Sequence, residues 1–121
     1  MPDPTVELFD RLARRGHDPF LEQVRGTVRF DLATDAEILY WSVTIDRGNV
    51  RVSRDEGDAD CIVHTTKARF DRVATGSANA MAMLLRAEMI VHGDVQLLVM
   101  LERLLPGPPG ARGPQLALGL R

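Results

Sequence analysis

The sequence contains little of what most catalytic or metal-binding sites require. It has one cysteine, Cys61, and three histidines, His17, His64 and His92, which are far apart along the chain. Metal ligands are usually found at short, recognisable spacings, and none occur here. A nucleophile elbow, a phosphate-binding loop and a dinucleotide fingerprint are also missing. The sequence therefore predicts no catalytic residue, no metal and no cofactor, and we expect a protein that is not an enzyme.

Other absences limit the compartment and the partners. A single cysteine excludes an intramolecular disulfide and is typical of a reducing compartment. No apolar run is long enough to span a membrane, and the first residues lack the apolar core of a signal peptide. The formal net charge of −2 lacks the basic excess of nucleic-acid binders. We expect a cytoplasmic protein without nucleic acid and without stable membrane insertion. Lys67 is the only lysine, a composition typical of bacteria.

The apolar periodicity predicts an α+β domain. The expected order is a helix, three strands, a fourth strand, two helices, a fifth strand and a last helix. The strands are expected at residues 24–32, 38–46, around Val50 and Val52, 59–65 and 89–92. Asp3 should cap the first helix, Gly16 should end it, and Ser77 should cap the third. The last helix, over 95–105, is apolar nearly all round and is expected to be buried on most sides.

Alternation along the strands assigns their side chains to two faces. Asp31 and Ser42 are expected on the outer, wet face, whereas Cys61 should lie inside, where burial raises the pKa of a thiol. The turn after residue 46 is expected to place Gly48 and Asn49 at positive φ. Residues 1–105 should form the domain. Residues 106–121 read as a Pro/Gly linker followed by an apolar tail.

Several motifs occur in an order that points to one family. They are V-x-F-D-L from Val28, W-S-V-T-I-D from Trp41, V-R-V from Val50, D-A-D-C-I-V from Asp58, the F-x-x-V-x-x-G pattern from Phe70, and A-E-M-I-V-H-G-D-V-Q-L-L-V-M-L from Ala87. Together they resemble the sterol carrier protein, or non-specific lipid-transfer, domain family over roughly residues 9–105. The lysines usual in the last strand of that family are absent.

The resemblance implies a five-stranded, mostly antiparallel sheet with helices covering one face. It also implies a tunnel between sheet and helices that takes up lipids, in proteins that act alone or as accessory domains of enzymes. We therefore expect the chain to bind or carry a fatty acid, acyl-CoA, sterol or isoprenoid. The face assignment then predicts these ligand-lining residues: Phe30, Leu39, Trp41, Val43, Val63, Phe70, Met81, Leu85, Met89, Leu97 and Leu101.

Alternatives remain at this point. An apolar stripe is the same whether it contacts a ligand or another side chain, so the fold could instead be a non-catalytic interaction or accessory module with a filled core. A homodimer is a further alternative. Leu116, Leu118 and Leu120 of the tail are expected to fold over the cavity mouth or to dock on another subunit. A small hydrolase or isomerase would need an ionisable residue inside the cavity. The acidic residues 55–60 favour a solvated loop, because the spacing of a calcium loop is missing.

Overall fold

The order of elements follows the predicted one in a computed structural model that describes residues 3–106. The elements are α1 (Pro4–Arg15), the 3-10 turn η1 (Pro19–Leu21), β1 (Arg25–Ala33), β2 (Ile38–Asp46), β3 (Asn49–Ser53), β4 (Cys61–Thr66), α2 (Lys67–Ala74), α3 (Ala80–Leu85), β5 (Ile90–Gly93) and α4 (Val95–Glu102). The turn η1 is an addition to the prediction. Residues 107–121, which include the predicted apolar tail, lie outside the described residues.

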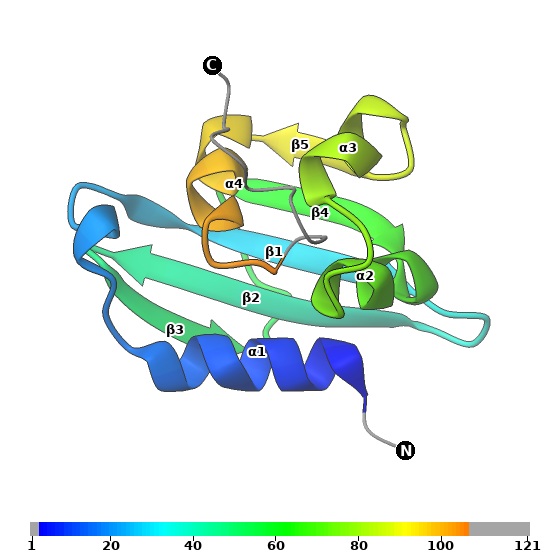
Figure 1. Cartoon of the computed structure of the whole chain (residues 1–121), viewed down its shortest axis with the longest axis horizontal. Coiled ribbons are helices and arrows are strands. Elements are labelled where there is room, and N and C mark those ends of the chain that lie inside the picture. The colour runs from blue at the N-terminus through cyan, green and yellow to red at the C-terminus, as the bar shows by residue number, and fades with distance from the viewer. Residues whose placement is uncertain (1–2, 107–121) are drawn as a thin grey trace.

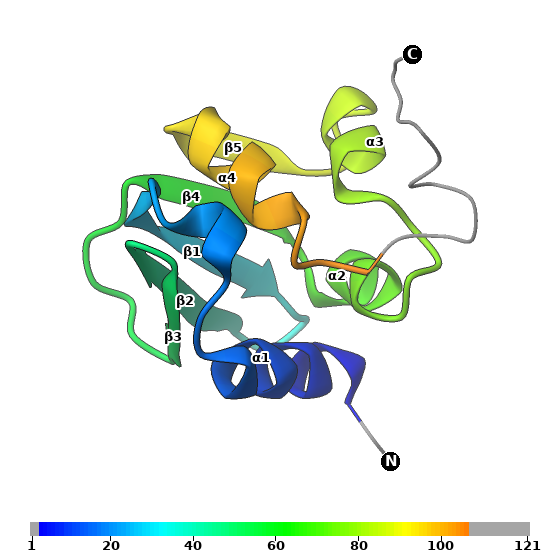
Figure 2. The same ribbon diagram turned by 60° about the vertical axis from the view of Figure 1, so that its left-hand side comes forward.

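The five strands form one sheet in the order β3-β2-β1-β4-β5. Only β1 and β4 run parallel, and the other neighbours are antiparallel. In the middle of the sheet, Phe30 of β1 lies between Trp41 of β2 and Val63 of β4. Figures 1 and 2 show α1, α2 and α4 over the same face of the sheet. The predicted five-stranded, mostly antiparallel sheet with helices on one face is therefore confirmed.

Four aromatic side chains, Phe9, Phe30, Trp41 and Phe70, form what we call the aromatic cluster. The ring of Phe9 stacks on Trp41 with centroids 4.5 Å apart, and on Phe70 at 5.6 Å. Phe30 closes the cluster at 5.2 Å from Phe70. All four side chains are buried. Because offset and tilted ring pairs add to the gain from burial, the cluster fixes α1 and α2 on the sheet.

The outer face of the sheet is less exposed than predicted. Asp31 and Ser42, both expected in water, are buried at 6 % exposure each. The reason is the loop over residues 54–60, which crosses this face. Ser42 donates a hydrogen bond to the carbonyl of Asp55, and Arg29 donates to the carboxylate of Asp31 and to loop carbonyls. A buried carboxylate is tolerated here because the guanidinium binds it at two points.

Two local predictions are corrected. Arg47 and Gly48 adopt positive φ in the β2–β3 turn, whereas Asn49 was expected to do so. Asp46 and Asn49 pair in the ladder between β2 and β3, so the hairpin loop consists of the two residues between them. Both residues of such a two-residue loop adopt positive φ. Asn79 caps α3 in place of Ser77, because its side chain accepts a hydrogen bond from the Ala82 amide.

The last helix is also shorter and more exposed than predicted. It ends at Glu102 and continues as a turn to Leu105. Leu97, Leu98 and Leu101 are buried against β1 and β4, but Val95 and Val99 are exposed. A helix that rests on one sheet buries only one stripe. The uniform apolar composition of this segment therefore led to a prediction of more burial than the helix has.

Candidate functional site

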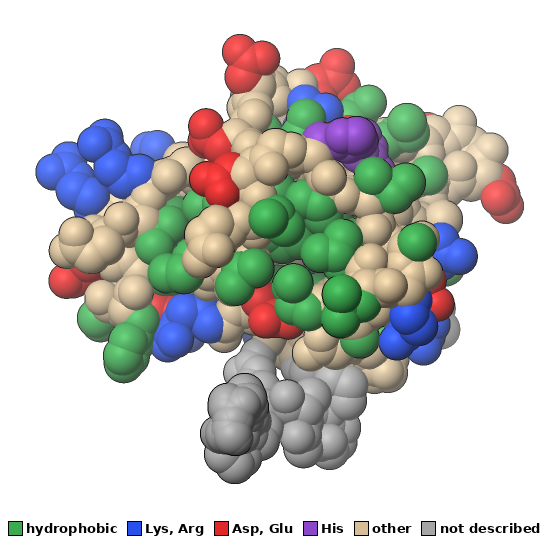
Figure 3. Space-filling model, turned by 90° about the horizontal axis from the view of Figure 1, so that it is seen from above, with side chains coloured by type: hydrophobic (Ala, Val, Ile, Leu, Met, Phe, Trp, Pro, Cys, Tyr) green, Lys and Arg blue, Asp and Glu red, His purple; other side chains and the backbone are tan. Residues whose placement is uncertain are grey.

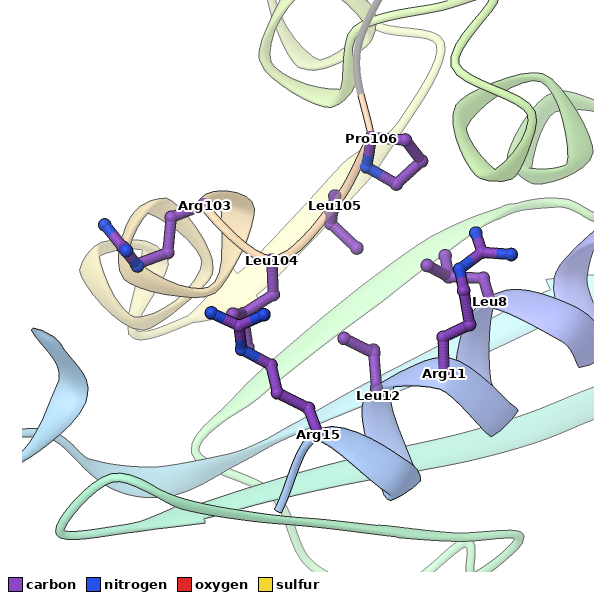
Figure 4. A pocket seen from close by; sticks show the side chains of 8 residues that line it. All are labelled: Leu8, Arg11, Leu12, Arg15, Arg103, Leu104, Leu105 and Pro106. Atoms are coloured by element: carbon purple, nitrogen blue, oxygen red, sulfur yellow. The ribbon is translucent and has the colours of Figure 1, made fainter. Parts of the chain in front are cut away.

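A pocket of about 300 Å³ lies between α1 and the turn that follows α4 (Figure 4). We call it the α1–α4 pocket. It is lined by Leu8, Arg11, Leu12, Arg15, Arg103, Leu104, Leu105 and Pro106. The two helices leave a seam because they rest on different parts of the molecule: α1 packs on β3 and α2, whereas α4 packs on β1 and β4. The volume is at the lower end of the range of roughly 300–1,000 Å³ for ligand pockets.

The spacing of residues along α1 places two kinds of side chain at this pocket. Leu8 and Leu12 are one helical turn apart and are buried, and Arg11 and Arg15 repeat the spacing on the exposed flank. Figure 4 shows Leu12 pointing toward the turn after α4. The wall is therefore amphipathic, with leucines at the base and guanidinium groups at the rim.

The other wall is formed by the turn after α4. Hydrogen bonds from the amides of Leu104 and Leu105 to the carbonyls of Leu101 and Glu102, at 2.8 and 2.9 Å, hold this turn. Leu105 is buried and Leu104 half-buried. The two leucines face those of α1 across the seam (Figure 4). An apolar chain that entered here would meet leucine side chains from both helices.

The rim of the pocket carries positive charge. Arg15 and Arg103 donate to the same carboxylate oxygen, Oδ2 of Asp18, at 3.2 and 3.1 Å. Burial alone would raise the pKa of Asp18, but hydrogen bonds from the Phe20 amide and from Arg103 outweigh it and hold that pKa below its ordinary value. Arg11 has no polar partner among residues 3–106. Three arginines line the pocket and two of them share one carboxylate, so the surplus positive charge favours an anion.

Most of the predicted ligand-lining residues lie in the hydrophobic core. Eight are buried: Phe30, Trp41, Val43, Val63, Phe70, Met89, Leu97 and Leu101. Leu39 and Met81 are half-buried. The expectation that Leu85 points inward is wrong, because it is 85 % exposed, and Met83 occupies the buried side of α3 instead. None of the eleven lines the α1–α4 pocket or the pockets at the start of α2 and the end of β4, so their contact with a ligand stays a prediction.

Two further pockets lie in the described part of the chain, and both differ from the α1–α4 pocket in the side chains that line them. One, of about 510 Å³, lies at the start of α2 and is lined by Ala33, Thr34, Asp35, Thr66, Lys67, Ala68 and Asp71. The other, of about 240 Å³, lies at the end of β4 near His64 and has Ile90 as its single large apolar residue. Neither combines several large apolar side chains with a charge of one sign. The α1–α4 pocket is therefore the better candidate for an amphiphile.

The side chains that could carry chemistry include the Cys61 thiol and the histidines, of which His64 lies 5.2 Å from the His92 ring and 3.6 Å from an Asp31 oxygen. Cys61 is buried, and that burial raises the pKa of its thiol, as predicted. Within residues 3–106, no group of three or more histidine, cysteine or acidic side chains is placed to hold a metal ion. In the same part of the chain, no helix combines the length and the apolar character needed to cross a membrane.

A second surface feature lies around the edge strand β5. Ile90 of β5 is exposed on the His64 side of the sheet, and Val95 and Val99 of α4 are exposed on the helix side, and we call these three side chains at the sheet edge the β5 patch. Figure 3 shows apolar side chains gathered on the face that carries β5, α3 and α4. Nothing in the described part of the chain covers this patch.

The sequence interpretation missed the polar residues of the site. It singled out neither Asp18 nor the arginines of α1. One signal was available: Asp18-Pro19 repeats the Asp3-Pro4 pattern, in which an aspartate caps a helical turn that begins with proline. That signal predicts η1, but no local pattern connects Asp18 to Arg103, which follows it by 85 residues.

The comparison with protein families gives a match over most of the chain. The family model described as the SCP-2 sterol transfer family matches residues 7–106. Among curated proteins, no match was found.

Solved structures with the same fold include lipid-bound proteins and part of an enzyme. Sterol carrier protein 2 from Aedes aegypti, in complex with the C16 fatty acid palmitate, is 24 % identical over 85 % of this chain and 94 % of its own, with a TM-score of 0.67. Palmitated SCP2L2 from the same organism is 18 % identical over 82 % and 92 %, with a TM-score of 0.66. A sec-alkylsulfatase from Pseudomonas sp. is 22 % identical over 88 % of this chain but only 16 % of its own, with a TM-score of 0.65.

Proposed function

The chain belongs to the SCP-2 sterol transfer family, and from that premise we propose that it binds and carries a lipid-like ligand, a fatty acid or a related single-chain amphiphile. The observation that carries this proposal is the α1–α4 pocket, which joins a leucine base to an arginine rim. A hydrocarbon chain would lie between the helices, and its polar end would stay at the rim. The two Aedes aegypti proteins with palmitate support a ligand of this class.

A hydrocarbon chain longer than the pocket must displace side chains of the buried core, so we infer that the helices separate to admit it. We propose that the hydrocarbon then reaches the predicted inner residues, among them Phe30, Leu97 and Leu101, and takes over contacts that these side chains make with one another. Burying roughly 400 Å² of apolar ligand contributes on the order of 10 kcal/mol before costs, at about 25 cal/mol per Å². Micromolar affinity needs about 8 kcal/mol, so few polar contacts are required.

We further propose that this domain works without catalysing a reaction, in the cytoplasm. The buried thiol of Cys61 and the absence of catalytic motifs support the first point. The single cysteine in the sequence supports the second. The sec-alkylsulfatase match over 16 % of that enzyme is consistent with a fold that also occurs as one part of larger proteins.

Calorimetric titration with palmitate, below the concentration at which it forms micelles, tests the carrier function. We expect micromolar binding to the intact protein. Leu104→Trp should weaken it at least tenfold, because a half-buried leucine of the pocket is replaced by a ring that fills the seam. Ile38→Trp is the matched control, since Ile38 is exposed and lines no described pocket, and it should bind as the parent does. An intact protein that does not bind palmitate, or a Leu104→Trp variant that binds it normally, would refute the proposal.

The β5 patch favours a second candidate function, an interaction module that pairs with another copy of this chain. Exposed apolar residues beside an edge strand are typical of an association surface. Light scattering after size-exclusion chromatography would then show a dimer for the parent and a monomer for Ile90→Glu. A monomeric parent at high micromolar concentration would exclude this role and leave the carrier function untouched.

A further inference from the structure

Asp18 is a fully buried carboxylate that the carrier function has not yet used. It precedes η1, and its Oδ1 accepts the amide hydrogen of Phe20 at 2.9 Å. Its Oδ2 accepts hydrogen bonds from Nη2 of Arg15 at 3.2 Å and from Nε of Arg103 at 3.1 Å. Both arginines line the α1–α4 pocket. A single oxygen atom therefore holds two of the three cations at the rim, one from each wall.

Without this carboxylate the two guanidinium groups would not stay where they are. Their side chains are 47 % and 41 % exposed, so water is available to both. Long arginine side chains regain rotamer freedom in water, and two like charges repel each other. Arg103 has one further contact, the ring of Phe20 at 4.4 Å. Asp18 itself is fixed by a backbone amide, so it can act as an anchor for both cations.

We propose that Asp18 is a positioning residue that sets the preference of the α1–α4 pocket for amphiphiles with an anionic head over neutral ones of the same chain length. It does so without touching the ligand, by holding Arg15 and Arg103 at the rim. This inference rests on the carrier function proposed above. Preorganised charged donors discriminate more strongly than mobile ones, because the ordering cost is met before the ligand binds.

Simple charge counting gives the opposite expectation, which makes the inference testable. Removing the negative charge of Asp18 raises the local charge of the rim by one unit and should strengthen the binding of anions. If Asp18 positions the two arginines, a variant without its charge should instead bind anions more weakly, because the two guanidinium donors turn into water. A purely structural role, in which Asp18 only ties η1 to α1 and α4, would change the affinity for charged and neutral ligands alike.

The experiment compares palmitate with 1-hexadecanol, which has the same chain length and a neutral head. In Asp18→Asn the amide oxygen can still accept from the Phe20 amide, but the charge is lost. The ratio of the two dissociation constants should shift toward the alcohol by about tenfold, the effect of losing one well-placed charged hydrogen bond. The affinity for 1-hexadecanol should stay as in the parent. Asp18→Glu, which restores the charge, should recover part of the preference.

Asp10→Asn is the matched control, because it removes the same charge from an exposed position on α1 that lines no described pocket. Its preference should equal or slightly exceed that of the parent. An unchanged or increased anion preference in Asp18→Asn overturns the positioning role, as does an equal loss for both ligands. A parent that binds neither ligand refutes the carrier function instead.

If Asp18→Asn does not fold, the Nε–H signal of Arg103 in the NMR spectrum of the parent decides. This signal should shift with palmitate and not with 1-hexadecanol, and no shift overturns the proposal.

Discussion

Leu8 and Phe9 are neighbours in α1, yet they belong to two different regions of the helix layer. Phe9 enters the aromatic cluster, where rings from α1, α2 and the sheet pack on one another at 4.5–5.6 Å. Leu8 lines the α1–α4 pocket, where leucines face a seam and the polar contacts are made by charged side chains. Both residues are buried almost completely. The difference between the two regions is therefore in what surrounds them and not in how deep they lie.

The two regions suggest a division between stability and binding. The rings of the aromatic cluster are in direct contact, so a change of side-chain volume there directly lowers the stability of the fold. The α1–α4 pocket is joined across its mouth by hydrogen bonds to Asp18, which can break and reform in water. Segments that admit a ligand are expected at the less stable end of a domain. One helix can serve both purposes because adjacent residues point to different neighbours.

The largest expected effect is a difference in the cost of truncating the two sides of α1. Phe9→Ala should lower the free energy of unfolding by about 3–5 kcal/mol, because it removes a ring that three other rings contact. Leu12→Ala should cost about 2 kcal/mol, near the lower limit for a buried leucine, since the pocket already lies beside it. Urea unfolding followed by circular dichroism measures both values.

Phe9→Leu serves as the control, since it retains most of the buried apolar area and should cost less than Phe9→Ala. If Phe9→Ala prevents folding altogether, the comparison is made between Phe9→Leu and Leu12→Val. Equal losses at Phe9 and Leu12 would contradict the division, because they would show that the seam is packed as tightly as the cluster.

Much of this fold could be predicted from the sequence, and the exceptions have a common cause. Alternation placed Phe30, Val43 and Val63 on the inner face, and the structure confirms that all three are buried. Local cap chemistry located the start and end of α1 at Asp3 and Gly16. These features depend on residues that are close in sequence, where periodicity and capping are informative.

The errors arose where distant segments meet. Asp31 is buried by a loop more than twenty residues further along the chain, and α3 turns Met83 inward and Leu85 outward because of how it rests on its neighbours. The candidate site fails for the same reason. The pocket exists only because α4 ends beside the leucines of α1, and Asp18 matters only because Arg103 reaches it. No pattern in the local sequence predicts that these distant segments lie side by side.

A smaller effect should separate the two regions by their response to pH. The folded protein lowers the pKa of Asp18 from its ordinary value of 3.8. A carboxyl group whose pKa is lower in the folded state stabilises the fold above its ordinary pKa, and this contribution is lost as the pH falls through the folded value. We expect Asp18→Asn to be less stable than the parent by about 1–3 kcal/mol at pH 6, as for a hydrogen bond to a charged group. The deficit should shrink steadily below about pH 4.

Urea midpoints of both proteins between pH 6 and pH 2 measure this change, and taking the difference removes the titration of all groups that the two proteins share. Phe9→Leu provides the contrast from the aromatic cluster. No side chain of that cluster titrates in this range, so the deficit of Phe9→Leu should be the same at every pH. If the deficit of Asp18→Asn were equally constant, the ion pairs with Arg15 and Arg103 would not be what holds the mouth of the pocket. The two regions would then be stabilised alike, by packing alone.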